Sequence, residues 1–223
     1  MTWVARAPSA SEPGRPRWGR LRGLVGANDP ITYMCIDIEA SGPVPGLFNM
    51  VSLGAVPVRL GTDGKWAVDT IELYQEYKPV FPGWDDGAEK IHNITRKHLE
   101  ATGLELKPAM EALKDWSKGL SKKTRLVFVG HNAPFDWSFV AYYYAYVGMD
   151  NPFGYNALDT KALAMGKLDL SWLETSKENL QRLLPSLPMQ DDKQVHNAVY
   201  DARYQAEILA ALMNLPKRTD LAK

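Results

Sequence analysis

Residues 31–42 read ITYMCIDIEASG, an apolar run that ends in two acidic side chains two positions apart. The run Ile31–Ile38 is rich in residues typical of strands, so it predicts a short buried strand. Side chains alternate between the two faces of a strand, which puts Asp37 and Glu39 on one face, roughly 6–7 Å apart. Two carboxylates at that distance repel each other unless a cation lies between them. The simpler interpretation is a strand end that carries acids into solvent.

The rest of the chain alternates between short apolar runs and amphipathic stretches. Residues 61–64 (GTDG) form a strong turn signal after the run Met50–Leu60, so we expect Trp66–Tyr77 to pair back as an antiparallel strand. Further strands are expected over Leu126–Val129 and Tyr155–Leu158. Helices are expected over Thr95–Ala101, Pro108–Leu120, Pro134–Val147, Asn179–Leu184 and Ala198–Leu215. This order indicates an α/β fold, a mixed β-sheet flanked by helices, in a single domain over residues 30–216.

The two ends of the chain differ from this central part in composition. Residues 1–29 carry five arginines against Glu12 and Asp29, a net charge of +3, and hold several prolines and glycines without hydrophobic periodicity. We predict a basic, disordered arm there, with a targeting signal as the alternative because the segment is rich in arginine and poor in acids. Residues 217–223 are assigned to a C-terminal tail. Because the sequence shows no pattern of a secretory signal, we expect a cytoplasmic protein.

The composition of the whole chain excludes several classes of protein. A single cysteine, Cys35, excludes a disulfide framework within the chain and a zinc site built on several thiolates. The longest apolar runs are far shorter than the roughly 18 residues that a membrane span requires. Basic and acidic side chains number 26 each, and the resulting net charge of zero argues at first against a nucleic-acid partner. Acids gathered around metal ions would remove that objection, because bound cations cancel their charge.

Two later loops share the pattern His-Asn-Ala, then an aromatic residue and an aspartate. Residues 131–136 (HNAPFD) follow an apolar strand, and residues 196–201 (HNAVYD) open the last expected helix. Both aspartates fall in the first turn of a helix, where the helix dipole favours a carboxylate. Taken alone, Asp136 and Asp201 are therefore interpreted as helix-start charges, and His196 as a surface histidine.

Taken together, four carboxylates and one histidine indicate a metal-dependent reaction. The set is Asp37, Glu39, Asp136, Asp201 and His196. Four oxygen donors without thiolates suit magnesium or manganese. Two such ions about 3.5–4 Å apart stabilise the attacking and leaving oxygens of an in-line phosphoryl displacement. A histidine near its ordinary pKa is a suitable base for the attacking water at neutral pH.

Residues 37–42 (DIEASG), 131–136 and 196–201 resemble, in this order, the three motifs of the DEDDh family of 3′–5′ exonucleases. The resemblance extends over about residues 31–215 and implies a ribonuclease H-like fold with two divalent ions, Mg²⁺ or Mn²⁺. The spacing of histidine and aspartate in the third motif resembles that of the histidine subclass of these enzymes.

The resemblance also implies a role for each matched acidic or basic side chain. Asp37 would bridge both metal ions. Glu39 and Asp201 would complete the shell of ligands, and Asp136 would hold the second ion. His196 would be the general base. All five residues are thus expected to be catalytic, and the four carboxylates are also the expected metal ligands.

A second implication of the resemblance is a set of substrate contacts: Ile38, Ala40, Ser41, Gly42, Asn132, Phe135 and His196. The Ser41 hydroxyl would line the pocket of the 3′-terminal nucleotide. Asp159 and Thr160 resemble a pair that supports the site from behind. Ala40 stands where many members have threonine, and residues 43–46 lengthen the loop after the first motif. Both departures lie at the terminal-nucleotide pocket, so they leave the substrate preference open.

Other distinctive residues have simpler interpretations. Residues 91–95 (IHNIT) resemble a family segment that approaches the substrate; apart from that resemblance, His92 is interpreted as a surface residue. Cys35, inside an apolar strand, is expected to be a small buried side chain. Four tyrosines in five helical positions must occupy both faces of their helix, so some are expected to pack in the core. These tyrosines are Tyr142, Tyr143, Tyr144 and Tyr146.

The sequence therefore predicts a metal-dependent 3′–5′ exonuclease that releases nucleoside 5′-monophosphates from the 3′ ends of single-stranded DNA or RNA. One alternative is a catalytically inactive scaffold of the same fold that binds nucleic acid or a protein. Another is an enzyme restricted to very short oligonucleotides. The motifs do not separate RNA from DNA. Several members of the family are dimers, so a homodimer is one alternative for the assembly, without a predicted interface.

Overall fold

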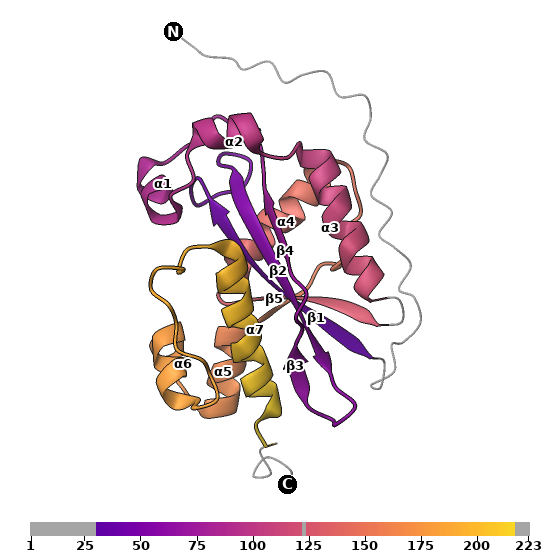
Figure 1. Cartoon of the computed structure of the whole chain (residues 1–223), viewed down its shortest axis with the longest axis vertical. Helices are drawn as coiled ribbons and strands as arrows, with labels where there is room; N and C mark the ends of the chain where they lie inside the picture. The colour runs from indigo at the N-terminus through magenta and orange to yellow at the C-terminus, as the bar shows by residue number, and fades with distance from the viewer. Residues whose placement is uncertain (1–29, 122–123, 217–223) are drawn as a thin grey trace.

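The computed structural model describes residues 30–121 and 124–216; the expected arm at 1–29 and tail at 217–223 lie outside them. Six strands form one mixed sheet in the order β3-β2-β1-β5-β6, and β4 also pairs with β2 (Figure 1). The strands are β1 (Ile31–Ala40), β2 (Met50–Leu60), β3 (Trp66–Val68), β4 (Leu73–Glu76), β5 (Arg125–Gly130) and β6 (Ala157–Asp159).

The direction of the central strands brings the expected motifs to one edge of the sheet. Strand β1 runs antiparallel to β2 and parallel to β5, and β5 runs parallel to β6. The carboxyl ends of β1, β5 and β6 therefore lie side by side. Asp37 and Glu39 are near the end of β1, His131 directly follows β5, and Asp159 ends β6. In open α/β sheets this edge is where ligands usually bind.

Helices cover both faces of the sheet. They are α1 (Asp86–His92), α2 (Arg96–Thr102), α3 (Leu106–Leu120), α4 (Ala133–Tyr146), α5 (Thr160–Leu168), the 3₁₀ helix η1 (Trp172–Thr175), α6 (Lys177–Leu183) and α7 (Ala198–Asn214). Met34, Ile36 and Ile38 of β1 share one buried cluster with α3 and α4. Cys35 shares a second cluster with α7, which crosses the opposite face in Figure 1. This arrangement confirms the predicted mixed α/β sheet.

The predicted antiparallel pairing of Trp66–Tyr77 is confirmed, but the segment is not one continuous strand. The segment forms two short strands, β3 and β4, which pair with different parts of β2. The break lies at Asp69, whose carboxylate accepts a hydrogen bond from the Ile71 N–H at 3.3 Å and pairs with Arg59. A local turn of this kind competes with strand hydrogen bonding, so the chain leaves the sheet between β3 and β4.

Two α-helices, α1 and α5, were not expected from the sequence, and neither was the short η1. Each of the two α-helices begins after an aspartate that caps its first turn. The Asp85 carboxylate accepts from the Gly87 and Ala88 N–H groups at 2.6 and 3.2 Å, and Asp159 accepts from Lys161 N–H at 2.8 Å. Both helices are short, 7 and 9 residues, so their hydrophobic periodicity is too brief to stand out.

Several predictions about single side chains can be checked directly. Cys35 is fully buried, as expected. Tyr143 and Tyr144 are also buried, whereas Tyr142 and Tyr146 are partly exposed, so the aromatic helix does pack on both sides. His92, interpreted as a surface residue, is only 7% exposed, and that interpretation is wrong. Across the described part of the chain, no helix is both long and apolar enough to span a membrane.

Candidate active site

A cavity of about 290 Å³ opens at the carboxyl edge of the sheet. Its walls come from β1, from the loop between β5 and α4, from the start of α6 and from the entrance of α7. All five residues expected to be catalytic line it: Asp37, Glu39, Asp136, Asp201 and His196. Segments about 160 residues apart in the sequence therefore converge on one cavity.

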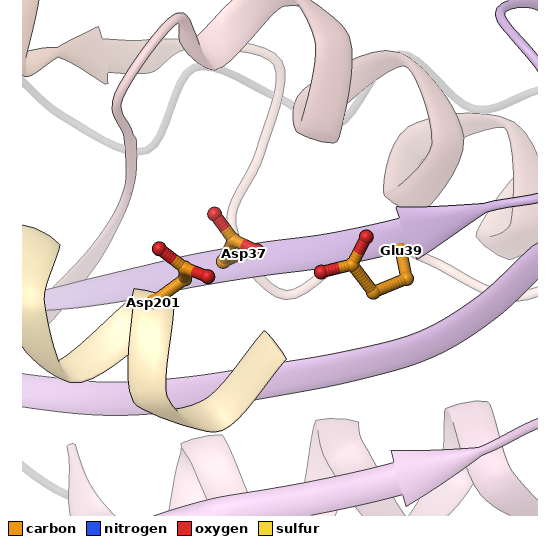
Figure 2. A group of neighbouring side chains, drawn as sticks. All are labelled: Asp37, Glu39 and Asp201. Atoms are coloured by element: carbon orange, nitrogen blue, oxygen red, sulfur yellow. The ribbon is translucent and has the colours of Figure 1, made fainter. Parts of the chain in front are cut away.

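Three of the four carboxylates form a tight group. Asp37 and Glu39 extend from the same face of β1, and Asp201 faces them from the first turn of α7 (Figure 2). One carboxylate oxygen from each residue lies within 4.8 Å of the other two. Hard oxygen donors at this spacing suit a divalent cation such as Mg²⁺ or Mn²⁺.

A glycine in β2 allows α7 to come this close to β1. Gly54 pairs with Asp37 in the strand register. A Cβ atom at position 54 would collide with the backbone carbonyl of Ala198, the first residue of α7. Only glycine leaves room for the helix entrance against the sheet, and the same approach carries Asp201 over β1.

The fourth carboxylate, Asp136, lies beside this group. It belongs to the first turn of α4 and is 5% exposed. Its Oδ1 accepts a hydrogen bond from the Ile38 N–H at 2.9 Å, so the backbone of β1 holds this carboxylate in place. Asp136 also lines the cavity, where its second oxygen could serve a second cation.

Crowding of these acids changes their proton affinity. Burial, followed by the charge of Asp136, raises the pKa of Asp37 well above its ordinary value. Burial, followed by the charges of Asp201 and Asp136, raises the pKa of Glu39 to about 8. Burial raises the pKa of Asp136 to about 7, against the lowering effect of the Ile38 hydrogen bond. Bound cations would favour the ionised forms of all three groups.

Both oxygens of Asp201 already have protein partners. Oδ1 forms an ion pair with the Lys177 ammonium, and Oδ2 accepts from the His196 N–H at 2.7 Å. Burial opposes the charge of Lys177, but Asp37 and Asp201 outweigh it, so the pKa of this lysine is raised. The His196 side chain is exposed at the mouth of the cavity, while its backbone is tied to Asp201.

Asp37 is held from behind by Gln205, one turn further along α7 than Asp201. Gln205 is fully buried. Its Nε2 donates to Asp37 Oδ1, and its Oε1 accepts from the His131 N–H at 3.2 Å. Because the His131 N–H can only donate, the amide oxygen of Gln205 must face it. The amide nitrogen of Gln205 therefore faces the Asp37 carboxylate. One side chain thereby links the elements that carry all three motifs.

The expected supporting pair extends this network. The Thr160 hydroxyl contacts His131 Nδ1 at 2.8 Å and the Gly130 carbonyl at 3.3 Å, so it links the histidine ring to the end of β5. Burial, with Lys177 and Lys161 adding to it, lowers the pKa of His131 to about 3, and this ring is neutral. Asp159 accepts from the Asn132 N–H at 3.3 Å. The network fixes the loop that leads to Asp136.

A second cavity of about 320 Å³ adjoins the first, and Ile38, Glu39 and Phe135 line both. Among the residues expected to contact substrate, Ala40 and Gly42 line this second cavity, and Asn132 lines the first. The walls of the second cavity are mainly apolar, so this cavity suits a flat, weakly polar group such as a nucleobase.

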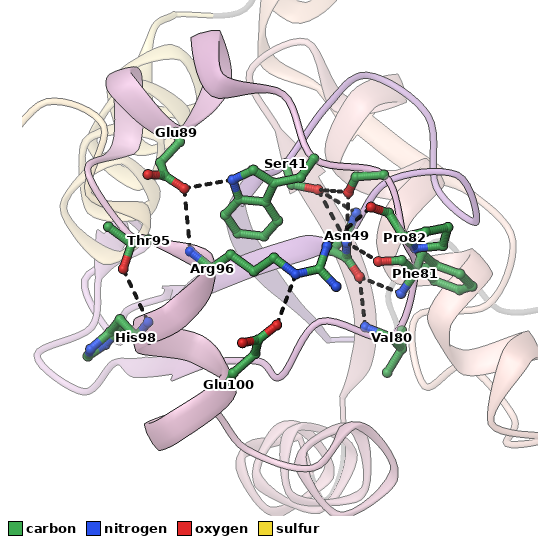
Figure 3. Close-up of polar contacts among 12 residues, drawn as sticks. Ser41, Asn49, Val80, Phe81, Pro82, Glu89, Thr95, Arg96, His98 and Glu100 are labelled. Atoms are coloured by element: carbon green, nitrogen blue, oxygen red, sulfur yellow. Dashed lines mark hydrogen bonds and ion pairs between the residues drawn. The ribbon is translucent and has the colours of Figure 1, made fainter.

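Ser41 lines neither cavity. It is fully buried, its hydroxyl donates to the Gly83 carbonyl at 2.9 Å, and it accepts from the Asn49 N–H at 2.9 Å (Figure 3). Asn49 also accepts from the N–H groups of Val80 and Phe81, both at 2.8 Å. Ser41 thus holds two loops together behind the second cavity, in contrast to the direct contact with substrate expected from the sequence.

His92 lines the second cavity from the end of α1. Its Nδ1 accepts from the Ile94 N–H at 3.1 Å, and burial lowers the pKa of the ring. The proton of the neutral ring is therefore on Nε2, which is buried and makes no hydrogen bond within the described residues. Trp84 packs edge-on against this ring and is fixed by Glu89, so it anchors the loop rather than standing free.

Comparison with known proteins places this geometry in a family. A family model described as an exonuclease, of the ribonuclease T type, matches residues 34–209. The Escherichia coli 3′–5′ DNA exonuclease Cap18 is 33% identical over 196 residues, which cover 86% of this chain and 97% of that protein. This chain belongs to the DEDDh family of 3′–5′ exonucleases. Ribonuclease T of Hahella chejuensis is 28% identical over 92% of this chain and 91% of its own length.

Solved structures of DEDDh and related exonucleases share the fold. The nuclease domain of 3′hExo, a DEDDh member bound to rAMP, gives a TM-score of 0.64 at 13% identity, over 84% of this chain and 92% of that chain. Exonuclease I of E. coli in complex with a dT13 oligonucleotide gives 0.61 at 17% identity, over 82% of this chain and 41% of that chain. At these identities the likeness concerns the fold alone.

Two residues of this DEDDh exonuclease were missed by sequence reasoning: Lys177 and Gln205. Gln205 carried a usable signal, since it lies four residues after Asp201 and thus on the same face of α7. Lys177 carried none, because its contact with the cage depends on how α6 packs near α7. His92 belongs to the segment that the sequence did connect with the substrate, and only its burial, beside Trp84 and the turn to Ile94, was not expected.

Proposed function

We propose that this protein removes nucleoside 5′-monophosphates one at a time from the 3′ ends of single-stranded nucleic acid. The observation that carries the proposal is the convergence of Asp37, Glu39, Asp136, Asp201 and His196 on one cavity. Membership of the exonuclease family supplies the reaction class, and the cavity supplies side chains suited to it. An inactive scaffold is disfavoured, because all five side chains are present and face the same space.

The acidic group fits divalent metal ions by the chemistry of its donors. Asp37, Glu39 and Asp201 would hold one ion, and Asp136 would hold a second ion together with Asp37. The donors are oxygens only, as Mg²⁺ and Mn²⁺ prefer. When bound, two such ions stabilise the negative charge that develops on the attacking and leaving oxygens. The network through Gln205 and Ile38 keeps the carboxylates oriented toward that place.

His196 is the proposed general base. Its ring lies at the mouth of the cavity, where water has access, and one of its ring nitrogens would accept the proton of the attacking water. The hydrogen bond from its backbone N–H to Asp201 fixes the position of the loop relative to the acidic group. His131 is poorly suited to this role, because its ring is bonded to Thr160 and burial lowers its pKa to about 3.

The second cavity is the proposed pocket of the terminal nucleotide. Ile38 and Phe135 line both cavities, so a nucleotide whose base lies in the second places its phosphate at the first. Ala40 and Gly42 offer apolar and backbone contacts there. The buried Nε2–H of His92 is a donor for an oxygen of the base or sugar, since a donor without a partner is costly to bury.

Single-stranded DNA is the proposed substrate. The support is the similarity to the E. coli DNA exonuclease, which extends over 97% of that protein at 33% identity. The ribonuclease T relatives make RNA the direct competitor to test. Very short oligonucleotides are the remaining competitor, because the two cavities together accommodate little more than the last nucleotide and its scissile bond.

The test is digestion of matched 5′-labelled DNA and RNA oligonucleotides, from dinucleotides upward, with products sized against time in Mg²⁺ and in EDTA. We expect stepwise shortening from the 3′ end in Mg²⁺ only, faster on DNA. Asp136→Ala should remove the activity and leave a folded protein. Asp115→Ala, which removes an exposed carboxylate of α3, is the matched control and should cleave like the unaltered chain. Full metal-dependent cleavage by Asp136→Ala would contradict the proposal.

A further inference from the structure

Lys177 places a positive charge inside the acidic cavity. Among the described residues that line this cavity, it is the only lysine or arginine. Its side chain is 22% exposed and forms an ion pair with Asp201, whose side chain is 6% exposed. Coulombic attraction extends from Lys177 to Asp37 and Asp136 as well. The ammonium group therefore lies among the carboxylates proposed to hold metal.

The position of Lys177 in its own helix gives no reason for a positive charge there. It is the first residue of α6, directly after the cap Ser176, whose hydroxyl accepts from the Asn179 N–H at 3.2 Å. A lysine in the first turn is disfavoured by the helix dipole, which attracts negative charge at that end. The favourable partner of Lys177 is Asp201 of α7. The positive charge of Lys177 therefore stabilises the acidic cavity and does not stabilise α6.

A metal ion at Asp201 and the ammonium of Lys177 compete for the same oxygen. Oδ1 of Asp201 is paired with Lys177, and Oδ2 accepts from the His196 N–H. An ion bound by Asp37, Glu39 and Asp201 would lie within a few ångströms of the ammonium. Two like charges at that distance repel strongly inside a partly buried site. The ammonium of Lys177 and a metal ion therefore cannot both bind Asp201 Oδ1 strongly at the same time.

We propose that Lys177 is the resident counter-ion of the acidic cage, and that metal binding at Asp201 exchanges its ammonium for the ion. This inference rests on the proposed metal site. Lys177 neutralises part of the carboxylate charge before the ion arrives and keeps Asp201 oriented toward β1. It leaves Oδ1 when the ion binds. The lysine thus stabilises the metal-free fold and weakens the affinity for metal.

The experiment measures Mn²⁺ binding through the electron paramagnetic resonance signal of the free ion, and thermal unfolding in EDTA and in saturating Mn²⁺. Lys177→Met removes the charge and keeps the length of the side chain. Lys161→Met is the matched control: its ammonium lies 4.4 Å from the centre of the Trp172 ring, over the neighbouring η1. It tests whether any nearby positive charge has the same effect as the contact with Asp201.

We expect Lys177→Met to bind Mn²⁺ at least about tenfold more tightly, because a positive charge in contact with the site is gone. Its melting temperature in EDTA should fall, so the gain on adding Mn²⁺ should exceed that of the unaltered chain. Lys161→Met should match the unaltered chain in both measurements. Lys177→Gln, which keeps a donor for Asp201, serves if Lys177→Met does not fold in EDTA, and should also bind Mn²⁺ more tightly.

Unchanged or weaker Mn²⁺ binding by folded Lys177→Met and Lys177→Gln would overturn the exchange and leave the metal site intact. An equal gain in Lys161→Met would also overturn it, since a general charge effect would then suffice. Absence of Mn²⁺ binding by the unaltered chain would overturn the metal site itself. Failure of the inference and failure of the proposed function are thus separate results.

Discussion

The entrances of α4 and α7 carry nearly the same six residues, HNAPFD at 131–136 and HNAVYD at 196–201, yet their histidines have opposite surroundings. His131 is half-buried, and its ring is bonded to Thr160. His196 is exposed at the mouth of the cavity. Both aspartates face the same cavity, one from each side. The local pattern therefore places the carboxylate, whereas the neighbouring elements decide what each histidine does.

The caps of the two helices differ in the same way. Asn197 caps α7 with its side chain, which accepts from the Tyr200 N–H at 3.2 Å. Asn132 has a left-handed backbone with φ of 74° and makes no side-chain cap bond to α4. Its N–H instead donates to Asp159. The α4 entrance is thus held by β6 and Gln205, and the α7 entrance mostly by its own cap.

The largest expected effect separates the two histidines. Asparagine tolerates the left-handed backbone of residue 196, whose φ is 67°, and has no basic ring. We expect His196→Asn to lower kcat by a factor of about 10²–10⁴, the usual contribution of a general base. Its free energy of unfolding should change by less than about 0.5 kcal/mol, because the side chain is exposed. Single-turnover cleavage and urea unfolding measure the two quantities.

His131→Asn is the matched change at the other entrance. It breaks the partly buried contact with Thr160, so we expect the free energy of unfolding to fall by about 1–3 kcal/mol. If His131→Asn kept full stability while His196→Asn unfolded easily, the contrast between a structural and a catalytic histidine would be wrong.

A smaller effect is expected from pH. The pKa of Asp136, at the α4 entrance, is raised from 3.8 to about 7 in the folded chain. At a pH below the ordinary pKa, Asp136 is protonated in both the folded and the unfolded chain. Between pH 3.8 and about pH 7 only the folded chain keeps the proton on Asp136. The folded chain therefore loses stability as the pH rises through this range. One pKa unit corresponds to about 1.4 kcal/mol, so the total loss is on the order of a few kcal/mol.

Melting temperatures in EDTA between pH 5 and pH 8 measure this effect. They should decline with pH, and saturating Mg²⁺ should remove the decline by stabilising the ionised carboxylates. Asp136→Asn, which keeps the acceptor for Ile38, should decline less than the unaltered chain. A metal-free chain that gains stability over this range would contradict the raised pKa values.

The smallest expected effect concerns the two caps. Asn197→Ala removes a side-chain cap and should lower the free energy of unfolding by about 1 kcal/mol. Asn132→Gly keeps a residue suited to positive φ and loses no cap bond, so its change should stay within about 0.5 kcal/mol. Urea unfolding of both variants measures the difference. Equal losses would mean that the two entrances are stabilised alike.

Much of the fold and the acidic site could be predicted, because the signals are local. Strand β1 is an apolar run of a few residues, and its alternation alone puts Asp37 and Glu39 on one face. The start of α7 follows from Asn197, a polar residue that caps the stretch after it. Once the order of the strands is known, these local signals are enough to predict that the four carboxylates lie at one edge of the sheet.

The partners of those carboxylates could not be predicted, because they are distant in sequence. Lys177 lies 24 residues from Asp201, and Gln205 lies 168 residues from Asp37. Gln205 shares a face of α7 with Asp201, which is a local signal, but nothing near Lys177 indicates its contact, because that contact depends on how α6 packs near α7. The role of Ser41 was missed for the same reason, since its hydroxyl bonds a loop 42 residues further along.

The central claim is that the carboxylates of β1, α4 and α7 hold divalent metal ions for the removal of 3′-terminal nucleotides. Anomalous diffraction from crystals of the chain soaked with Mn²⁺ and a nucleoside 5′-monophosphate tests it most directly. The account predicts anomalous peaks in contact with Asp37, Glu39, Asp136 and Asp201, with the nucleotide phosphate beside them. Peaks elsewhere only, in crystals of a chain that cleaves DNA in Mn²⁺, would contradict it.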